Sequence, residues 1–252
     1  MAQGPSDEAL AVARREAKEL MNGGALATIL TGSHARGEAH EESDLDVRAV
    51  GDGPGKHLKR TRGFLVSLSA MSLDDNHDAF SDPEEVGEFV PGWRDAVILF
   101  DPKDVAAELQ QRAVQWTWDE VADSAPDWVA EQIALLGEEV HTLVGNIDQG
   151  QLSGAAAIRS QIVEGLATAL AVREHLLYGS ENELWSMVGE AMGGEYADAQ
   201  DVALWLKDRP FPDTCAATFR LYVLAADGSM SLLDKRRSEV VRHARSLAQE
   251  RS

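Results

Sequence analysis

The sequence has 252 residues, with 23 Lys and Arg against 43 Asp and Glu, and its formal net charge at pH 7 is −20. Hydrophobic residues make up 44% and charged residues 26%, which is typical of a folded protein and excludes disorder of the whole chain. The sequence contains no apolar run of about 18 residues, so we expect no transmembrane helix. The negative charge disfavours nucleic acid and membrane surfaces as partners and attracts cations, although solubility alone also explains it.

Two features of the sequence indicate the cellular compartment of the protein. The N-terminal segment carries acidic residues throughout and lacks the apolar core of a signal peptide. Cys215 is the single cysteine, so no internal disulfide can form and a reducing environment is indicated. We therefore expect a cytoplasmic protein.

The first hundred residues have the pattern of a small α/β unit. An amphipathic helix is predicted over residues 6–21, because acidic residues occupy its first turn and two glycines follow it. Short apolar or alternating runs predict four strands, at residues 25–30, 44–50, 64–71 and 96–100. Residues 72–92 are polar and acidic, so we expect mainly loop there, with one short helix at most.

Helical spacing dominates after Pro102. It predicts helices near residues 103–118, 126–147, 152–178, 183–192, 213–226 and 229–250. Gly179 is expected to end the longest of them. The predicted fold class is thus α/β in the broad sense (α+β), with a small mixed β-sheet domain over residues 1–102 and an all-helical bundle domain over residues 103–252.

The run from Gly32 to Asp46, GSHARGEAHEESDLD, indicates chemistry. Gly32 and Ser33 follow a buried strand, where a tight turn leaves backbone N–H groups free to bind an anion. Asp44 and Asp46 lie two positions apart on the next strand, so both carboxylates face the same side. Two carboxylates beside a phosphate-binding turn suit Mg²⁺ and the transfer of a phosphoryl or nucleotidyl group.

This run resembles the signature of the polymerase-β-like nucleotidyltransferase superfamily, in which Gly-Ser precedes Asp-x-Asp at this spacing. Residues 35–37, Ala-Arg-Gly, and Ser43 are also in register, and they make the run most similar to the minimal nucleotidyltransferases and the antibiotic nucleotidyltransferases of the aminoglycoside and lincosamide types. The resemblance covers 15 residues, from position 32 to position 46. It implies a nucleotidyltransferase domain over residues 1–102 and an acceptor-binding helical domain over residues 103–252.

The resemblance also implies roles for single residues. Gly32 and Ser33 would bind the nucleotide phosphates, while Asp44 and Asp46 would hold Mg²⁺ and act in catalysis. Arg36 has two interpretations, either a phosphate contact or a pairing with a nearby acid or carbonyl that fixes the loop.

Two neighbouring histidines are given no role in the site. His34 and His40 are expected at the surface, since no second pair of ligands at zinc spacing accompanies them.

One position departs from the family pattern. The family adds a third carboxylate on a later, neighbouring strand, and Ser67 occupies that place here. A serine is not a comparable base at neutral pH. A loop with Asp74, Asp75 and Asp78 could supply the acid instead. Glu164 could also supply it, since its surroundings are similar to a helix that borders the acceptor pocket in antibiotic nucleotidyltransferases. Alternatively, Glu164 could be exposed or paired with Arg159 or Arg173.

The resemblance therefore implies an enzyme that uses Mg²⁺ as cofactor and ATP as co-substrate and moves AMP to a hydroxyl of a small polar acceptor. The acidic charge favours a cationic, aminoglycoside-like antibiotic as that acceptor, with a neutral lincosamide-like one as an alternative. Two other functions are retained, namely a catalytically degenerate nucleotide-binding protein, as Ser67 indicates, and an antitoxin-type enzyme that adds AMP to a protein. No nucleic acid or membrane partner is expected, and a homodimer is left open.

Overall fold

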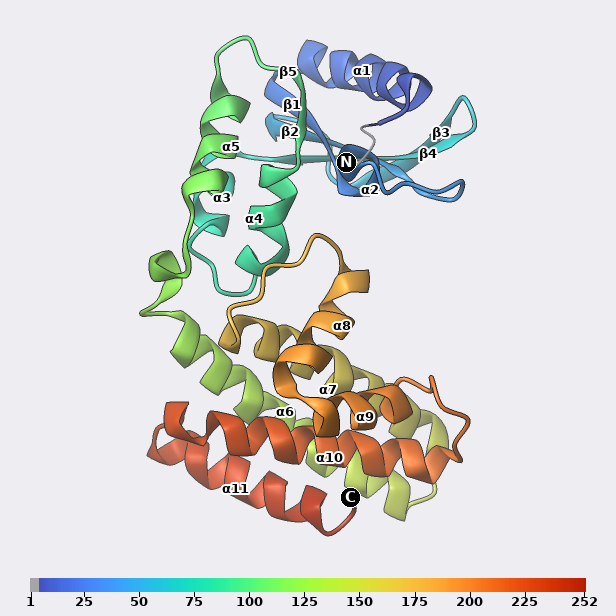
Figure 1. Cartoon of the computed structure of the whole chain (residues 1–252), viewed down its shortest axis with the longest axis vertical. Coiled ribbons are helices and arrows are strands. Elements are labelled where there is room, and N and C mark those ends of the chain that lie inside the picture. The colour runs from blue at the N-terminus through green and yellow to red at the C-terminus, as the bar shows by residue number, and fades with distance from the viewer. Residues whose placement is uncertain (1–4) are drawn as a thin grey trace. The chain divides into compact units, whose positions relative to one another are not determined.

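The computed structural model describes residues 5–252 and divides into two compact units, one ending at Glu120 and the other beginning at Val121 (Figure 1). The first unit is mixed α and β and the second is helical, so the predicted fold class is confirmed. The first unit contains α1 (Asp7–Asn22), β1 (Ala25–Thr31), α2 (Gly32–Arg36), β2 (Leu45–Gly51), β3 (His57–Thr61), β4 (Phe64–Met71), α3 (Leu73–Ala79), α4 (Val86–Arg94), β5 (Val97–Phe100) and α5 (Val105–Gln115).

The five strands of the first unit form one mixed sheet in the order β3-β4-β2-β1-β5. β2 is flanked by antiparallel β1 and parallel β4. Helix α1 lies on one side of this sheet and α3, α4 and α5 lie on the other (Figure 1). Under α1, Val12 packs in one apolar cluster with Leu30, Leu45 and Val47, all of them buried. The residues that alternate with Leu45 and Val47 along β2 therefore face away from α1.

The structure corrects the expectation of loop over residues 72–92. Two helices occur there, α3 and α4. The Ser72 hydroxyl accepts a hydrogen bond from the Asp75 N–H and caps α3. On α4, Phe89 and Trp93 are buried, and the Phe89 ring meets Phe80 edge-on with centroids 5.0 Å apart. The i, i+4 spacing of these two aromatic residues was the helical signal, and the acidic residues around them obscured it.

β3 is an edge strand that the sequence analysis did not predict. None of its residues is buried, so it lacks the apolar alternation of a half-buried strand. It pairs antiparallel with β4 from Thr61 opposite Phe64 to His57 opposite Leu68. The strand is therefore identified by its hydrogen-bonded pairing with β4 and not by its own sequence pattern.

Helix α5 packs within the first unit. The Arg94 guanidinium at the end of α4 donates hydrogen bonds to the carbonyls of Ala113, at 2.9 Å, and Trp116, at 3.1 Å. These bonds tie residues after Pro102 to the sheet-bearing unit. The compact units accordingly divide after Glu120, later than the change of sequence pattern at Pro102.

The second unit is built from helices. They are α6 (Ala125–Asp148), α7 (Leu152–Arg173), α8 (Glu181–Met192), α9 (Gly194–Ala203), α10 (Phe211–Ser229) and α11 (Lys235–Gln249), with a short 3₁₀ turn at η2 (Met230–Leu232). A second 3₁₀ turn, η1 (Trp118–Val121), spans the boundary between the two units. By length and composition α7 could cross a membrane, but 56% of its apolar window is buried inside the structure. It is thus a core helix of the bundle.

Helix α7 ends before the predicted position. Its last residue is Arg173, and His175, with φ 56°, takes the left-handed conformation that was expected at Gly179. The Leu176 N–H then donates to the Ala171 carbonyl at 2.8 Å, which closes the helix end. The prediction of a helix to residue 178 was wrong because this local turn uses a non-glycine residue.

Truncation of Leu30 to Ala should lower the free energy of unfolding of the first unit by about 3 kcal/mol, because a fully buried leucine leaves a cavity between α1 and the sheet. Leu58→Ala is a matched control on β3, where the side chain is 58% exposed, and it should change stability by less than about 0.5 kcal/mol. Urea unfolding followed by circular dichroism checks both. Equal losses in the two variants would contradict this account of the core.

Candidate active site

The turn at the end of β1 depends on a glycine. Gly32 begins α2 with φ +71°, a conformation that other residues rarely adopt. A Cβ atom built on Gly32 would lie only 2.6 Å from Oδ2 of Asp46. This close approach follows from the ladder, because Thr31, the residue before Gly32, pairs with Asp46 across β1 and β2. The turn and the carboxylate are therefore held against each other by backbone pairing.

Asp46 lies near the start of β2, the central strand of the sheet, at the end of the sheet where the turn follows β1. It stands between Thr31 on β1 and Ser67 on β4, and Asp44 precedes β2. Burial raises the pKa of the Asp46 carboxyl above its ordinary value, and the negative charge of Asp44 raises it further. A hydrogen bond from Ser67 partly offsets both effects by lowering the same pKa. The two carboxylates thus repel each other in a partly desolvated place.

This pair of acids fits a divalent cation. Within residues 5–252, neither Asp44 nor Asp46 takes part in an ion pair. A bound cation would remove the repulsion that raises the pKa of Asp46. Mg²⁺ is typically held by one or two carboxylates together with substrate phosphates and water, so this donor set is sufficient for it. The described part of the chain brings no group of three or more His, Cys, Asp and Glu side chains together for a metal.

Ser67 lies next to Asp46 in the parallel ladder, at the position where the resemblance implies a third acid. It is buried, and it donates its hydrogen bond to Asp46. The candidate replacements Asp74 and Asp75 begin helix α3, where Asp75 accepts a hydrogen bond from the Ser72 hydroxyl at 2.7 Å. Their structural role is to start that helix, since acidic residues suit a helix N-terminus. Asp78 lies exposed on the same helix.

Two cations near Asp46 were not singled out in the sequence. The positive charges of Arg48 and Lys56 both lower the pKa of Asp46. Arg48 follows Asp46 by two positions on β2, so it faces the same side of the sheet. That spacing was the available signal for Arg48, whereas Lys56 precedes β3 and only the strand pairing brings it close.

The loop after the turn contains an internal ion pair. Arg36 donates from Nε to Glu38 at 2.7 Å, which is the pairing interpretation of its role. Gly37, with φ 74°, ends α2 in the left-handed conformation. Arg36 as a phosphate contact stays a prediction.

The expectation for one of the two histidines was wrong. His34 is buried, with 7% of its surface exposed, and its ring meets Phe64 edge-on at 5.9 Å. His40 is exposed, as expected, and its Nδ1 accepts a hydrogen bond from the Glu42 N–H at 3.2 Å. Burial of His34 depends on an aromatic residue from β4, which is distant in the sequence.

Glu164 belongs to the second unit. It is exposed on α7. Arg159 donates to the Ala203 carbonyl at 2.5 Å and Arg173 pairs with Glu174, so the arginines considered as partners of Glu164 are engaged elsewhere. Its role as a general base stays a prediction.

Comparisons with known proteins agree with this geometry. Residues 12–114, which include the turn and both aspartates, match the family model described as a nucleotidyltransferase domain. No curated protein matches the sequence. Among solved structures, the chain is similar to a nucleotidyltransferase-like protein from Exiguobacterium sibiricum, with a TM-score of 0.55 and 13% identity over 88% of this chain and 76% of that chain. At this identity, the structural similarity shows the fold alone.

Replacement of Gly32 by Ala should lower the free energy of unfolding of the first unit by about 2 kcal/mol, because the left-handed backbone is strained and the new methyl group collides with Asp46. Gly55→Ala is the control, since a Cβ there meets no atom within 4 Å. Thermal and urea denaturation measure both. A Gly32 variant as stable as the control would mean that the turn does not press on Asp46.

Asp46→Asn should make the metal-free protein more stable at pH 7. The folded-state pKa of Asp46 is raised, so the wild type loses stability as pH rises from the ordinary value of 3.8 through the folded value. The advantage of the Asn variant should accordingly shrink as pH falls towards 3.8. Unfolding in urea across this pH range tests it, with the exposed Asp52→Asn as control. A gain that does not depend on pH would contradict the assignment to the Asp46 carboxylate.

Proposed function

Because residues 12–114 form a nucleotidyltransferase domain of the polymerase-β-like superfamily, we propose that the protein is an Mg²⁺-dependent enzyme that transfers AMP from ATP to a hydroxyl of a small polar acceptor. The observation that supports this most is the Asp46 carboxylate pressed against the Gly32 turn, with Asp44 beside it. The Gly32 turn and the carboxylate pair thereby lie at the same end of the paired strands β1 and β2. Backbone N–H groups and a pair of carboxylates are the groups required to hold a metal-bound triphosphate.

In this proposal the chain positions the reactants. Asp44 and Asp46 would hold Mg²⁺, which when bound neutralises the triphosphate and makes its α-phosphorus easier to attack. The backbone N–H groups at Gly32 and Ser33 would orient the phosphates. The acceptor oxygen would bond to the α-phosphorus, the bond to the β-phosphate would break, and pyrophosphate would leave. The hydroxyl proton would go to a base, for which Glu164 is the candidate.

Arg48 and Lys56 fit this arrangement because they bring positive charge to the same carboxylate. Arginine and lysine side chains bind phosphate oxygens by charge-assisted hydrogen bonds.

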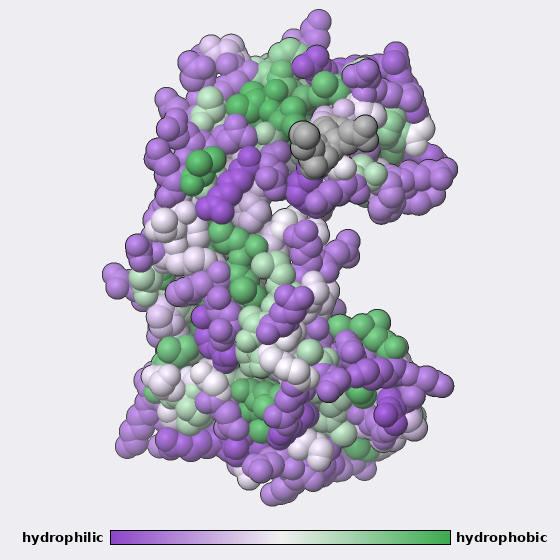
Figure 2. All heavy atoms as spheres, viewed as in Figure 1, coloured by the Kyte–Doolittle hydropathy of each residue, from purple (hydrophilic) through white to green (hydrophobic). Residues whose placement is uncertain are grey.

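The acceptor is proposed from charge. The chain carries a net charge of −20, and hydrophilic side chains cover most of the displayed surface of each unit (Figure 2). The negative net charge attracts ammonium groups, so we propose an aminoglycoside-like polycation as the acceptor, in a cytoplasmic setting. Ser67 supports a second candidate function, a nucleotide-binding protein without transferase activity, because the place of the third acid lacks a carboxylate.

Calorimetry should detect Mg²⁺-dependent binding of a non-hydrolysable ATP analogue to the wild-type protein. Asp44→Asn should abolish this binding, because removal of one carboxylate removes a metal ligand. Asp52→Asn, at an exposed aspartate, should bind as the wild type does. Mass spectrometry after incubation with ATP and an aminoglycoside then tests transfer. Binding without any adenylylated product would favour the second candidate function, and no binding in the wild type would contradict both.

Ser67→Asp should raise the affinity for Mn²⁺ several-fold, because it places a third carboxylate next to Asp46 in the ladder. It should also lower the stability of the metal-free protein, since three like charges then repel. Ser69→Asp is the matched control two residues further along β4, opposite Arg48. Electron paramagnetic resonance of free Mn²⁺ measures the affinities. An equal effect of both variants would show that bulk charge, and not the position of Ser67, controls metal binding.

A further inference from the structure

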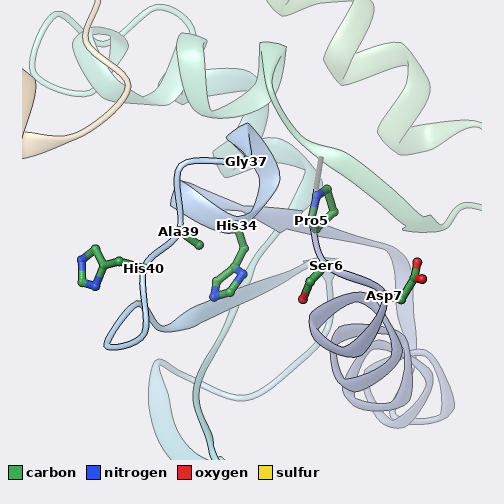
Figure 3. Close-up of a pocket in the computed structure, with 7 residues that line it drawn as sticks. All are labelled: Pro5, Ser6, Asp7, His34, Gly37, Ala39 and His40. Atoms are coloured by element: carbon green, nitrogen blue, oxygen red, sulfur yellow. The ribbon is translucent and has the colours of Figure 1, made fainter. Parts of the chain in front are cut away.

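A pocket lies on the α1 side of the first unit. It has a volume of about 590 Å³ and opens between the start of α1 and the loop that follows α2 (Figure 3). Its lining includes Pro5, Ser6, Asp7, His34, Ala39 and His40.

The pocket is separate from the carboxylate pair. His34 packs on Phe64, and Phe64 packs against the apolar cluster under α1. Asp46, by contrast, alternates along β2 with Leu45 and Val47 of that cluster, so it faces the opposite side of the sheet. The pocket therefore does not share its lining with the proposed metal site.

His34 is the residue of this pocket that carries an unsatisfied buried polar atom. Only 7% of its surface is exposed, and its Nε2 atom is buried without a hydrogen-bond partner in the part of the chain that the structure describes. A buried polar atom left without a partner costs about 1–3 kcal/mol. Figure 3 shows the His34 ring directed into the space between the α2–β2 loop and the start of α1. A bound ligand that accepts a hydrogen bond from Nε2 would remove this cost.

The opposite wall offers hydrogen-bond donors. The pocket contains the N-terminus of α1, a helix of 16 residues. The Ala9 and Leu10 N–H groups are bonded to Ser6, whereas the N–H groups of Asp7 and Glu8 have no carbonyl partner within the helix. Ser6 caps this end, and since its Oγ accepts from the Ala9 N–H, its hydroxyl hydrogen is free to donate. The Asp7 carboxylate points away from His34 (Figure 3). A helix N-terminus facing an imidazole is an environment for an anion.

We propose that this pocket binds a small oxyanion of the phosphate class, held by the His34 imidazole N–H, the Ser6 hydroxyl and the two free N–H groups at the start of α1, those of Asp7 and Glu8. The site does not depend on the proposed transferase function. It has one structural link to that function, because α2 carries both Ser33 and His34 and an anion at His34 would fix the helix that bears the phosphate-binding turn.

The direct test is nuclear magnetic resonance of protein labelled with ¹⁵N at histidine. Titration with sodium phosphate, at constant pH and ionic strength against sodium chloride, should produce a saturable shift of the His34 Nε2 signal. His34→Phe, which keeps an aromatic ring against Phe64, should weaken phosphate binding measured by calorimetry by about tenfold. His34→Gln, which keeps an N–H donor, should retain part of the affinity. His57→Phe, at an exposed histidine, should bind phosphate as the wild type does.

Parallel titrations with pyrophosphate and with AMP distinguish a free phosphate from a phosphoryl group on a larger molecule, and saturation by any of the three supports the site. Asp44→Asn separates this pocket from the nucleotide site, and it should leave phosphate binding unchanged. Loss of binding in Asp44→Asn would place the anion at the carboxylate pair and overturn the proposal. So would a wild-type His34 signal that responds to phosphate no more than to chloride.

Discussion

The structure of the candidate active site depends on one close approach, that of the Gly32 backbone to the Asp46 carboxylate. The antiparallel pairing of β1 and β2 sets the distance, and only a residue without a side chain fits at φ +71° with Asp46 Oδ2 so near. The same pairing holds Asp46 in a partly buried position, which together with Asp44 raises its pKa. One backbone register therefore places the Gly32 turn beside the two repelling carboxylates, which a cation would stabilise.

The charges around Asp46 differ from those implied by the family resemblance. A hydroxyl, Ser67, stands where a third carboxylate was expected, and it acts on Asp46 by donating a hydrogen bond. Positive charge from Arg48 and Lys56 acts on the same carboxylate. Fewer acids and added cations make the site less negative than a three-carboxylate site.

Much of this could be predicted from the sequence, because the turn, β1 and β2 are local patterns with strong periodicity and α1 carries its own cap. The places where prediction was wrong or silent depend on distant partners. β3 has no buried residue and is defined by its pairing with β4. His34 is buried by Phe64 from another strand, and the carbonyls that tie α5 to the sheet-bearing unit lie far from their donor, Arg94. Neither contact leaves a periodic signal in the sequence.

We propose that Asp44 and Asp46 hold a divalent cation beside the Gly32 turn. Crystals grown with Mn²⁺ and a non-hydrolysable ATP analogue test it most directly, since Mn²⁺ is located by anomalous scattering. The account predicts an anomalous peak in contact with both carboxylates, with nucleotide phosphates on the N–H groups of the turn. A peak elsewhere, or phosphates bound without any cation at Asp46, would contradict it.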